Sequence, residues 1–362
     1  MKPAAPHFAQ SYGEARQKFL AAVSAAGLGV QSIAHPLPGH DGEPLAMDVV
    51  RQGPVDARQL LMITSACHGV EGFCGSGVQV ALLNHAPWHA AVRESGCAVL
   101  YIHALNPHGF SHWRRVTQEN VDLNRNWHDF SQPLPENAGY DELAAAVIPP
   151  RWPEPPETAQ QLADFAVRHG ARAQQTALSG GQYRHPMGIF YGGTAPTWSH
   201  LTLRQVMREQ ASRCARLAWI DLHTGLGPNG HGERIYAGKD DAAALQRARA
   251  WWGPEVTSIY DGSSSSALLK GLMWSVVDWE CPQAEYTGIA LEYGTQPLAE
   301  VLNALRGDHW LFAHPQEGAP QREAIRRRMR DAFYTDTDEW KQRIVDQGLE
   351  AGLQALAGLS RA

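Results

Sequence analysis

The stretch Leu60–Gly72 reads LLMITSACHGVEG, an apolar run that passes directly into a histidine and a glutamate. Apolar runs of this length, bounded by turn residues, are typical of strands buried on both faces of a sheet. We expect a strand over Leu60–Ala66 and similar strands over three further runs. These are Ala98–Ala104 (AVLYIHA), Leu217–Leu222 (LAWIDL) and Gly288–Leu291 (GIAL). Together they predict a mostly parallel central sheet.

Amphipathic helical patterns alternate with these strands. They cover Gly75–Asn84, Glu157–Leu178, Leu201–Arg213 and Asp241–Trp252. Alternation of strands and helices is the pattern of α/β proteins, in which helices cover a parallel sheet. The sequence therefore predicts an α/β three-layer sandwich with helices on both faces of the sheet.

The flanking regions complete a single expected domain over residues 1–362. Residues 1–57 predict an N-terminal helix and a hairpin, because residues 29–58 alternate weakly and contain Pro-Gly and Asp-Gly turns. The proline-rich residues 131–156 predict a long surface loop. Residues 58–315 form the expected catalytic core, and the charged, periodic residues 316–362 predict C-terminal helices.

Composition excludes several classes of protein. The 362 residues are 44% hydrophobic and 19% charged, which fits a folded globular protein. The formal net charge of -6 and the scattered basic residues predict no binding to nucleic acid or to a membrane surface. Five cysteines without a CxxC pair argue against a disulfide framework. With no apolar signal segment at the start, we expect a cytoplasmic location; the oligomeric state stays open.

Metal-binding residue types follow two of the predicted strands. His68 and Glu71 come after the first strand and His223 after the third. Ligands of open α/β sheets bind beyond the carboxyl ends of strands. A catalytic zinc ion takes three imidazole or carboxylate ligands and keeps one open position. An isolated HxxE more often holds a structural histidine, but the combination predicts one Zn²⁺ bound by His68, Glu71 and His223.

Two further carboxylates are candidates for the same site. Glu292 ends the run Gly288–Leu291, and an acidic residue at the end of a buried strand is costly unless paired or functional. We interpret it as a general base that removes a proton from water; the alternative is a structural salt bridge. Asp122 could accept the free N–H of His68 and orient that ring.

Residues 113–127 read WRRVTQENVDLNRNW and supply candidate cationic groups. Arg114 or Arg115 could stabilise the oxyanion of a tetrahedral intermediate. Asn124 and Arg125 could hold a substrate carboxylate through paired hydrogen bonds. The alternative is a solvated charged loop, but this segment follows a predicted strand and should lie at the same edge of the sheet.

The ordered motifs HGVEG, NPHGF, WRR, VDLNRNW, DLHTG and LEYGT resemble the zinc carboxypeptidase superfamily. The set is similar to carboxypeptidase A-type metallopeptidases and, in DLHTG, to aspartoacylase and succinylglutamate desuccinylase relatives. It most resembles a little-characterised bacterial branch. The resemblance covers roughly residues 60–295 and implies a mixed central sheet of the zinc-dependent exopeptidase type.

The resemblance also implies a role for each matching residue. His68, Glu71 and His223 match the zinc ligands of the superfamily, and Asp122 matches the carboxylate behind the first histidine. Asn124 and Arg125 match the pair that binds the substrate carboxylate. Glu292 matches the general base. Arg114 matches the arginine that polarises the scissile carbonyl, and Arg115 aligns equally well. Tyr260 lies in the interval of the family's mobile tyrosine; an ordinary strand-end tyrosine is the alternative.

These residues predict a zinc-dependent hydrolase of an amide bond. A metallocarboxypeptidase is the leading hypothesis. The substrate would be a peptide or an N-acyl amino acid with a free carboxylate. An N-acyl amino acid amidohydrolase of the aspartoacylase type is the alternative. A non-catalytic binding protein is a third hypothesis, but it would predict a missing ligand or base, and every position is filled.

Overall fold

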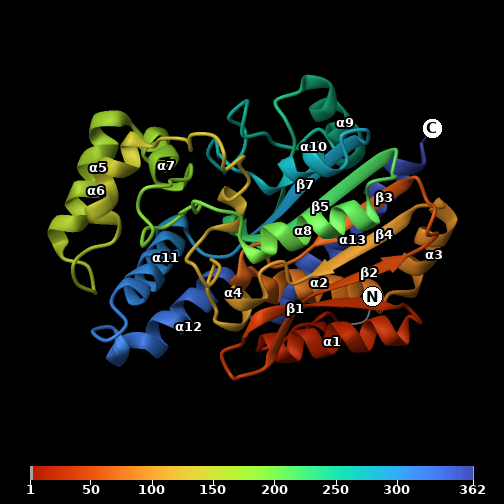
Figure 1. Ribbon diagram of the computed structural model, residues 1–362, viewed down its shortest axis with the longest axis horizontal. Helices are drawn as coiled ribbons and strands as arrows, with labels where there is room; N and C mark the ends of the chain where they lie inside the picture. The colour runs from red at the N-terminus through yellow and green to blue at the C-terminus, as the bar shows by residue number, and fades with distance from the viewer. Residues whose placement is uncertain (1–2, 362) are drawn as a thin grey trace.

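The fold is built on one seven-stranded mixed sheet with strand order β1-β2-β4-β3-β5-β7-β6 (Figure 1). The computed structural model describes residues 3–361. The strands are β1 (Val30–Pro38), β2 (Pro44–Gln52), β3 (Gln59–Thr64), β4 (Ala98–His103), β5 (Arg216–Asn229), β6 (Gly232–Tyr236) and β7 (Glu285–Gly294).

The four predicted strands are the parallel centre of this sheet. β3 pairs in parallel with β4 and with β5, and β5 pairs in parallel with β7. The predicted hairpin forms β1 and β2, which extend one edge in antiparallel register, and β6 closes the other edge antiparallel to β7. The α/β class and the mixed sheet are therefore confirmed.

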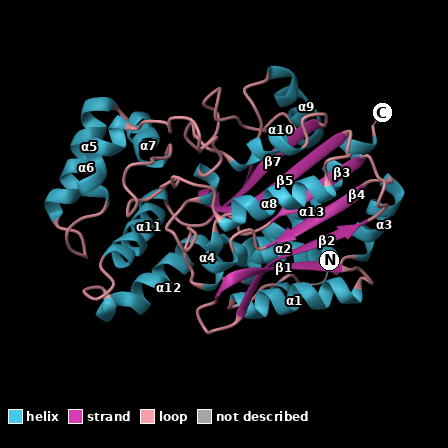
Figure 2. Cartoon of the chain, in the orientation of Figure 1, coloured by secondary structure: helices cyan, strands magenta, loops and turns pink. Residues whose placement is uncertain are grey.

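Helices cover both faces of the sheet (Figure 2). They are α1 (Tyr12–Ala25), α2 (Gly72–Leu83), α3 (Ala86–Ser95), α4 (Pro107–Ser111), α5 (Ala138–Val147), α6 (Pro156–His169), α7 (Ala171–Ser179), α8 (Trp198–Gln210), α9 (Ala242–Trp252), α10 (Val276–Glu280), α11 (Leu298–Ala313), α12 (Arg322–Phe333) and α13 (Asp338–Ser360). None of the helices within residues 3–361 is both long and apolar enough to cross a membrane.

Strand β3 shows how the sequence assembles two cores. Leu61 and Ile63 belong to the hydrophobic cluster that contains residues of α1, α2 and α13. Leu60 and Met62 belong to a second cluster with residues of α8 and α10. Successive side chains of a strand point to opposite faces, so an unbroken apolar run buries both faces of the sheet.

One helix prediction and one loop prediction differ from the structure. The helix expected over Glu157–Leu178 is two helices, α6 and α7, because Gly170 between them adopts φ 91° and ends the first. The loop expected over residues 131–156 contains α5. Its cap is Asn137, whose side chain accepts from the Tyr140 N–H, so a local hydrogen bond starts a helix inside a proline-rich segment.

The insertion formed by α5, α6 and α7 lies at one end of the molecule, on the same side as α11 and α12 (Figure 1). It separates the parallel strand β4 from β5 in the sequence. Residues of α7 and α11 line one cavity together with the carboxyl ends of β5 and β7. The insertion therefore completes the wall of the functional site.

Candidate active site

The ends of neighbouring parallel strands bring the predicted metal ligands together. His68 follows β3, and His223 lies in β5, which pairs with β3 up to Thr64–Asp221. Glu71 ends a short 3-10 turn, η2 (Gly69–Glu71). His68, Glu71 and His223 are 3%, 1% and 4% exposed, and the two imidazole centroids lie 5.0 Å apart. Three residues spread over more than 150 positions thus share one buried centre.

The donor atoms form two overlapping sets. Glu71 Oε2 lies 3.0 Å from His223 Nδ1 and also accepts from the Thr224 N–H. Donor atoms of Cys67, His68 and His223 all lie within 4.8 Å of one another, a group that does not include Glu71. The structure therefore places the Cys67 sulfur beside two of the predicted metal ligands.

A cationic side chain already contacts these donors. Arg115 donates from Nη2 to His68 Nε2 at 2.7 Å and from Nη1 to Glu71 Oε1 at 2.9 Å. Its Nε donates to Asp122 Oδ2 at 2.9 Å. Imidazole nitrogen and carboxylate oxygen are the ligands that zinc prefers. Because the donor set is buried, has that chemistry and accommodates a positive charge, His68, Glu71 and His223 fit a zinc ion.

His68 is held in the neutral form that a metal requires. Burial and the adjacent Arg115 lower its pKa well below the ordinary value. Its Nδ1 is buried without a hydrogen bond and lies 3.5 Å from Asp122 Oδ1. The predicted partnership of Asp122 with His68 is thus a close approach, while the hydrogen bond of that carboxylate goes to Arg115. Arg115 also holds the pKa of Asp122 below its usual range against the effect of burial.

His223 has a carboxylate partner that the sequence interpretation missed. Asp221 Oδ2 lies 2.6 Å from His223 Nε2, and Asp221 Oδ1 accepts from the Thr64 hydroxyl. Burial favours the neutral ring, but Asp221 and Glu71 raise the pKa of His223 well above its ordinary value. Residues two apart in a strand share a face. The spacing in DLHTG therefore carried a signal for Asp221.

Glu292 lies beside this centre without a cationic partner. It is aligned with His223 in the pairing of β5 and β7. Its Oε1 accepts from the Leu226 N–H at 2.9 Å, and no lysine or arginine within residues 3–361 forms an ion pair with it. Burial and the charge of Glu71 raise the pKa of Glu292 to about 8. A carboxylate with a pKa near neutrality suits proton transfer. The alternative, that Glu292 forms a structural salt bridge, is not supported by the ion pairs of residues 3–361.

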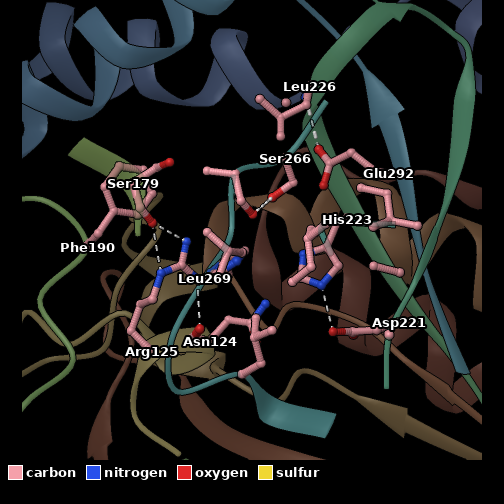
Figure 3. Close-up of a pocket in the computed structure, with 18 of the residues that line it drawn as sticks. Asn124, Arg125, Ser179, Phe190, Asp221, His223, Leu226, Ser266, Leu269 and Glu292 are labelled. Atoms are coloured by element: carbon pink, nitrogen blue, oxygen red, sulfur yellow. Dashed lines mark hydrogen bonds and ion pairs between the residues drawn. The ribbon is translucent and has the colours of Figure 1, made fainter. Parts of the chain in front are cut away.

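Arg125 keeps donors free for an anion. It is 2% exposed; its Nε and Nη2 donate to the Ser179 carbonyl, and its Nη1 donates to the Asn124 carbonyl. A guanidinium carries five N–H donors, so two remain. The Asn124 side-chain oxygen accepts from the Met273 N–H. Figure 3 shows Arg125 and Asn124 on one side of the cavity and His223 and Glu292 on the other.

Two predicted site residues lie elsewhere. Arg114 forms an ion pair with Asp308 and donates to Asn120, and it does not line the cavity. Tyr260 donates its hydroxyl to the Gly238 carbonyl at 2.9 Å and does not line the cavity either. Of the two candidate arginines, the structure therefore brings Arg115 to the predicted metal ligands His68 and Glu71.

The family model described as "Protein of unknown function (DUF2817)" matches residues 8–347. The chain belongs to this family. No curated protein matches it in sequence. The DUF2817 description assigns no chemistry, so the function has to be argued from the site.

Solved structures share the fold at low sequence identity. Thrombin activatable fibrinolysis inhibitor matches with a TM-score of 0.55 and 11% identity over 97% of this chain and 74% of that one. The bovine protein, in complex with tick carboxypeptidase inhibitor, gives 0.52 and 12% over 98% of each chain. A metallo-carboxypeptidase from Burkholderia cenocepacia gives 0.44 and 11% over 98% and 70%. The first two matches show that the chain shares its overall fold with these proteins.

One cavity of about 430 Å³ connects these groups. Its walls are mainly apolar, with charged groups at the metal centre, at Arg125 and at Arg172. The Arg172 side chain donates to the Ser266 carbonyl and the Gln175 side chain donates to the Ser265 carbonyl, so hydrogen bonds join α7 to the loop that contains residues 263–266 at the cavity wall. A cavity of this size and lining suits a small ligand with one or two polar groups.

Proposed function

We propose that this chain is a zinc-dependent hydrolase of an amide bond that lies next to a free carboxylate. The observation that carries the proposal is the single cavity shared by His68, His223, Arg115, Glu292 and Arg125. A metal-binding donor set, a base, a cation and a carboxylate anchor are the parts that such a reaction needs. The shared carboxypeptidase-like fold supports the same chemistry.

Each side chain has a distinct task in this proposal. Zinc, when bound, supplies Lewis acidity that polarises a carbonyl and lowers the pKa of water. Glu292 accepts the proton from the attacking water and passes it to the leaving amine. Arg115 donates a hydrogen bond to the oxygen that becomes negative as water adds. Asp122 and Glu71 keep the Arg115 guanidinium oriented through their carboxylates.

The carboxylate anchor decides which amide is cleaved. The free N–H groups of Arg125 donate hydrogen bonds to a substrate carboxylate, on the side of the cavity opposite Glu292 (Figure 3). A metallocarboxypeptidase acting on the last residue of a peptide satisfies this geometry. An N-acyl amino acid hydrolase satisfies it equally, and the mainly apolar lining of a cavity of about 430 Å³ favours this second candidate.

Replacement of the base tests the proposal. We expect Glu292→Gln to reduce kcat by at least about a hundredfold on peptides and N-acyl amino acids while zinc stays bound. Zinc content is measured on protein purified without chelator, and Glu317→Gln, an exposed glutamate, serves as the control. Unchanged turnover in Glu292→Gln would reject the base, and protein without zinc would support the non-catalytic hypothesis.

A further inference from the structure

Part of the cavity wall is an apolar lobe away from the strands. We define the acyl lobe as the six uncharged side chains contributed by α7, α11 and the segment before α8: Leu178, Phe190, Leu298, Val301, Leu302 and Leu305. α7 and α11 both lie at the end of the molecule that carries the insertion (Figure 1). The acyl lobe therefore owes part of its wall to the inserted helices.

The acyl lobe adjoins the reacting groups through Phe190. The Phe190 ring centroid lies 5.2 Å from the guanidinium carbon of Arg115 and 5.4 Å from that of Arg125. Phe190 has φ 54°, a left-handed conformation that costs a bulky residue free energy. The surrounding fold therefore holds the Phe190 ring in this conformation beside both arginines.

One side chain of the acyl lobe is partly open to solvent. Leu298, at the first position of α11, is 44% exposed although it faces the cavity. The charged groups of the cavity, Arg115, Arg125 and Arg172, are not among the six side chains of the lobe, which present an apolar surface beside them. An apolar group placed against this surface gains about 0.8 kcal/mol for each methylene that it buries.

A second apolar surface is available for the rest of the substrate. Ala290 in β7 is half-buried although its strand is paired on both sides, because its methyl group faces the cavity. Trp219 and Tyr286 flank it on the same face of the sheet. An amino-acid side chain placed on this sheet-side floor leaves the acyl lobe for the group on the other side of the amide.

We propose that the substrate is an N-acyl amino acid with an apolar acyl chain that lies in the acyl lobe. This inference rests on the proposed function and narrows its substrate. Water adds its oxygen to the acyl carbon, the C–N bond breaks, and the proton taken by Glu292 goes to the nitrogen. The products are a carboxylic acid with an apolar chain and a free amino acid held by Arg125.

A series of acyl lengths tests the proposal. Acetyl, hexanoyl and decanoyl derivatives of phenylalanine are compared by kcat/KM. We expect a rise of about two- to fourfold per added methylene until the acyl lobe is filled, since about 0.8 kcal/mol corresponds to about fourfold. Dependence on the amino-acid side chain with no dependence on acyl length would overturn the assignment of the lobe.

Two exposed leucines provide a matched pair of variants. Leu298→Ser should remove at least about threefold of the advantage of decanoyl over acetyl substrate, while Leu353→Ser, on α13 and 39% exposed, should leave the ratio unchanged. Equal ratios in both variants would contradict the proposal. If no substrate is hydrolysed, the proposed function fails. The assignment of the acyl lobe is then tested by calorimetric binding to Glu292→Gln. Tighter binding of N-decanoyl-phenylalanine than of N-acetyl-phenylalanine would support the assignment, and any other result would overturn it.

Discussion

Arg114 and Arg115 are neighbours in the chain but serve different parts of the molecule. Arg115 contacts His68, Glu71 and Asp122 inside the cavity, whereas Arg114 pairs with Asp308 outside it. A lysine keeps the charge but offers no planar fork of donors, so it cannot replace several directed hydrogen bonds at once. The two side chains therefore differ in their surroundings: Arg115 lines the cavity, where we propose that it acts on substrate, and Arg114 does not line it.

We expect Arg115→Lys to lower kcat/KM by at least about a hundredfold, because an oxyanion donor is lost. Arg114→Lys should keep kcat/KM within about threefold and instead lower the free energy of unfolding by about 1 kcal/mol, through its partly buried ion pair. Kinetics and urea unfolding of both variants provide the measurement. A greater loss of activity in Arg114→Lys would reverse the assignment.

Most candidate site residues could be predicted from the sequence because they follow strands in the chain. The sequence did not show whether Arg114 or Arg115 faces the metal ligands, because that depends on the backbone turn at Trp113. Trp113 has φ 55°, and the Gly69 and Val70 N–H groups donate to the carbonyls of Arg115 and Arg114. Contacts between two distant loops thus select which arginine faces the donors, and no local pattern in WRR records them.

The 3-10 turn η2 depends on a close approach of backbones. A Cβ atom on Gly69 would lie 2.1 Å from the Gly109 carbonyl carbon and 2.3 Å from the Phe110 nitrogen, both in α4. Backbone atoms on that side cannot yield as a flexible side chain would. The turn that carries Glu71 can therefore pack on α4 only when its first residue is glycine.

Gly69→Ala should lower the free energy of unfolding by about 3 kcal/mol or displace η2. In either case we expect the affinity for zinc to fall. Urea unfolding and a chelator competition assay report the two effects. Gly29→Ala is the control, because a Cβ atom there meets nothing within 4 Å. If the two variants were equally stable and held zinc equally well, the turn would not need the close approach.

Strands were easier to predict than the elements that shape the cavity. Apolar runs identified all four parallel strands, since burial on both faces leaves a continuous signal. α11 and β6 were not predicted, and α7 was merged with α6, yet α7 and α11 form the acyl lobe. Their identity as cavity walls depends on packing across the insertion, which composition alone does not encode.

The whole molecule carries a set of histidines that folding keeps neutral. Burial is the main cause that lowers the pKa to about 4 in His103, His112, His200 and His309 and to about 3 in His108. In the unfolded chain each ring titrates near its ordinary pKa of about 6.5. Below that pH the unfolded state binds more protons than the folded one, so acid destabilises the fold.

His103 isolates one contribution to this acid sensitivity. The ring is fully buried, stacks on Phe19 with centroids 4.4 Å apart, and shares a hydrogen bond with the Ser76 hydroxyl. The stability that its neutral form provides is complete above about pH 6.5 and is lost as pH falls toward 4, by about 3 kcal/mol in total.

We expect His103→Phe to be somewhat less stable at pH 7 but to lose less stability between pH 6.5 and 4.5. Urea unfolding at both pH values measures this difference, with the exposed His231→Phe as the control. An equal loss of stability in His103→Phe and the unmodified protein would show that other groups govern the acid response.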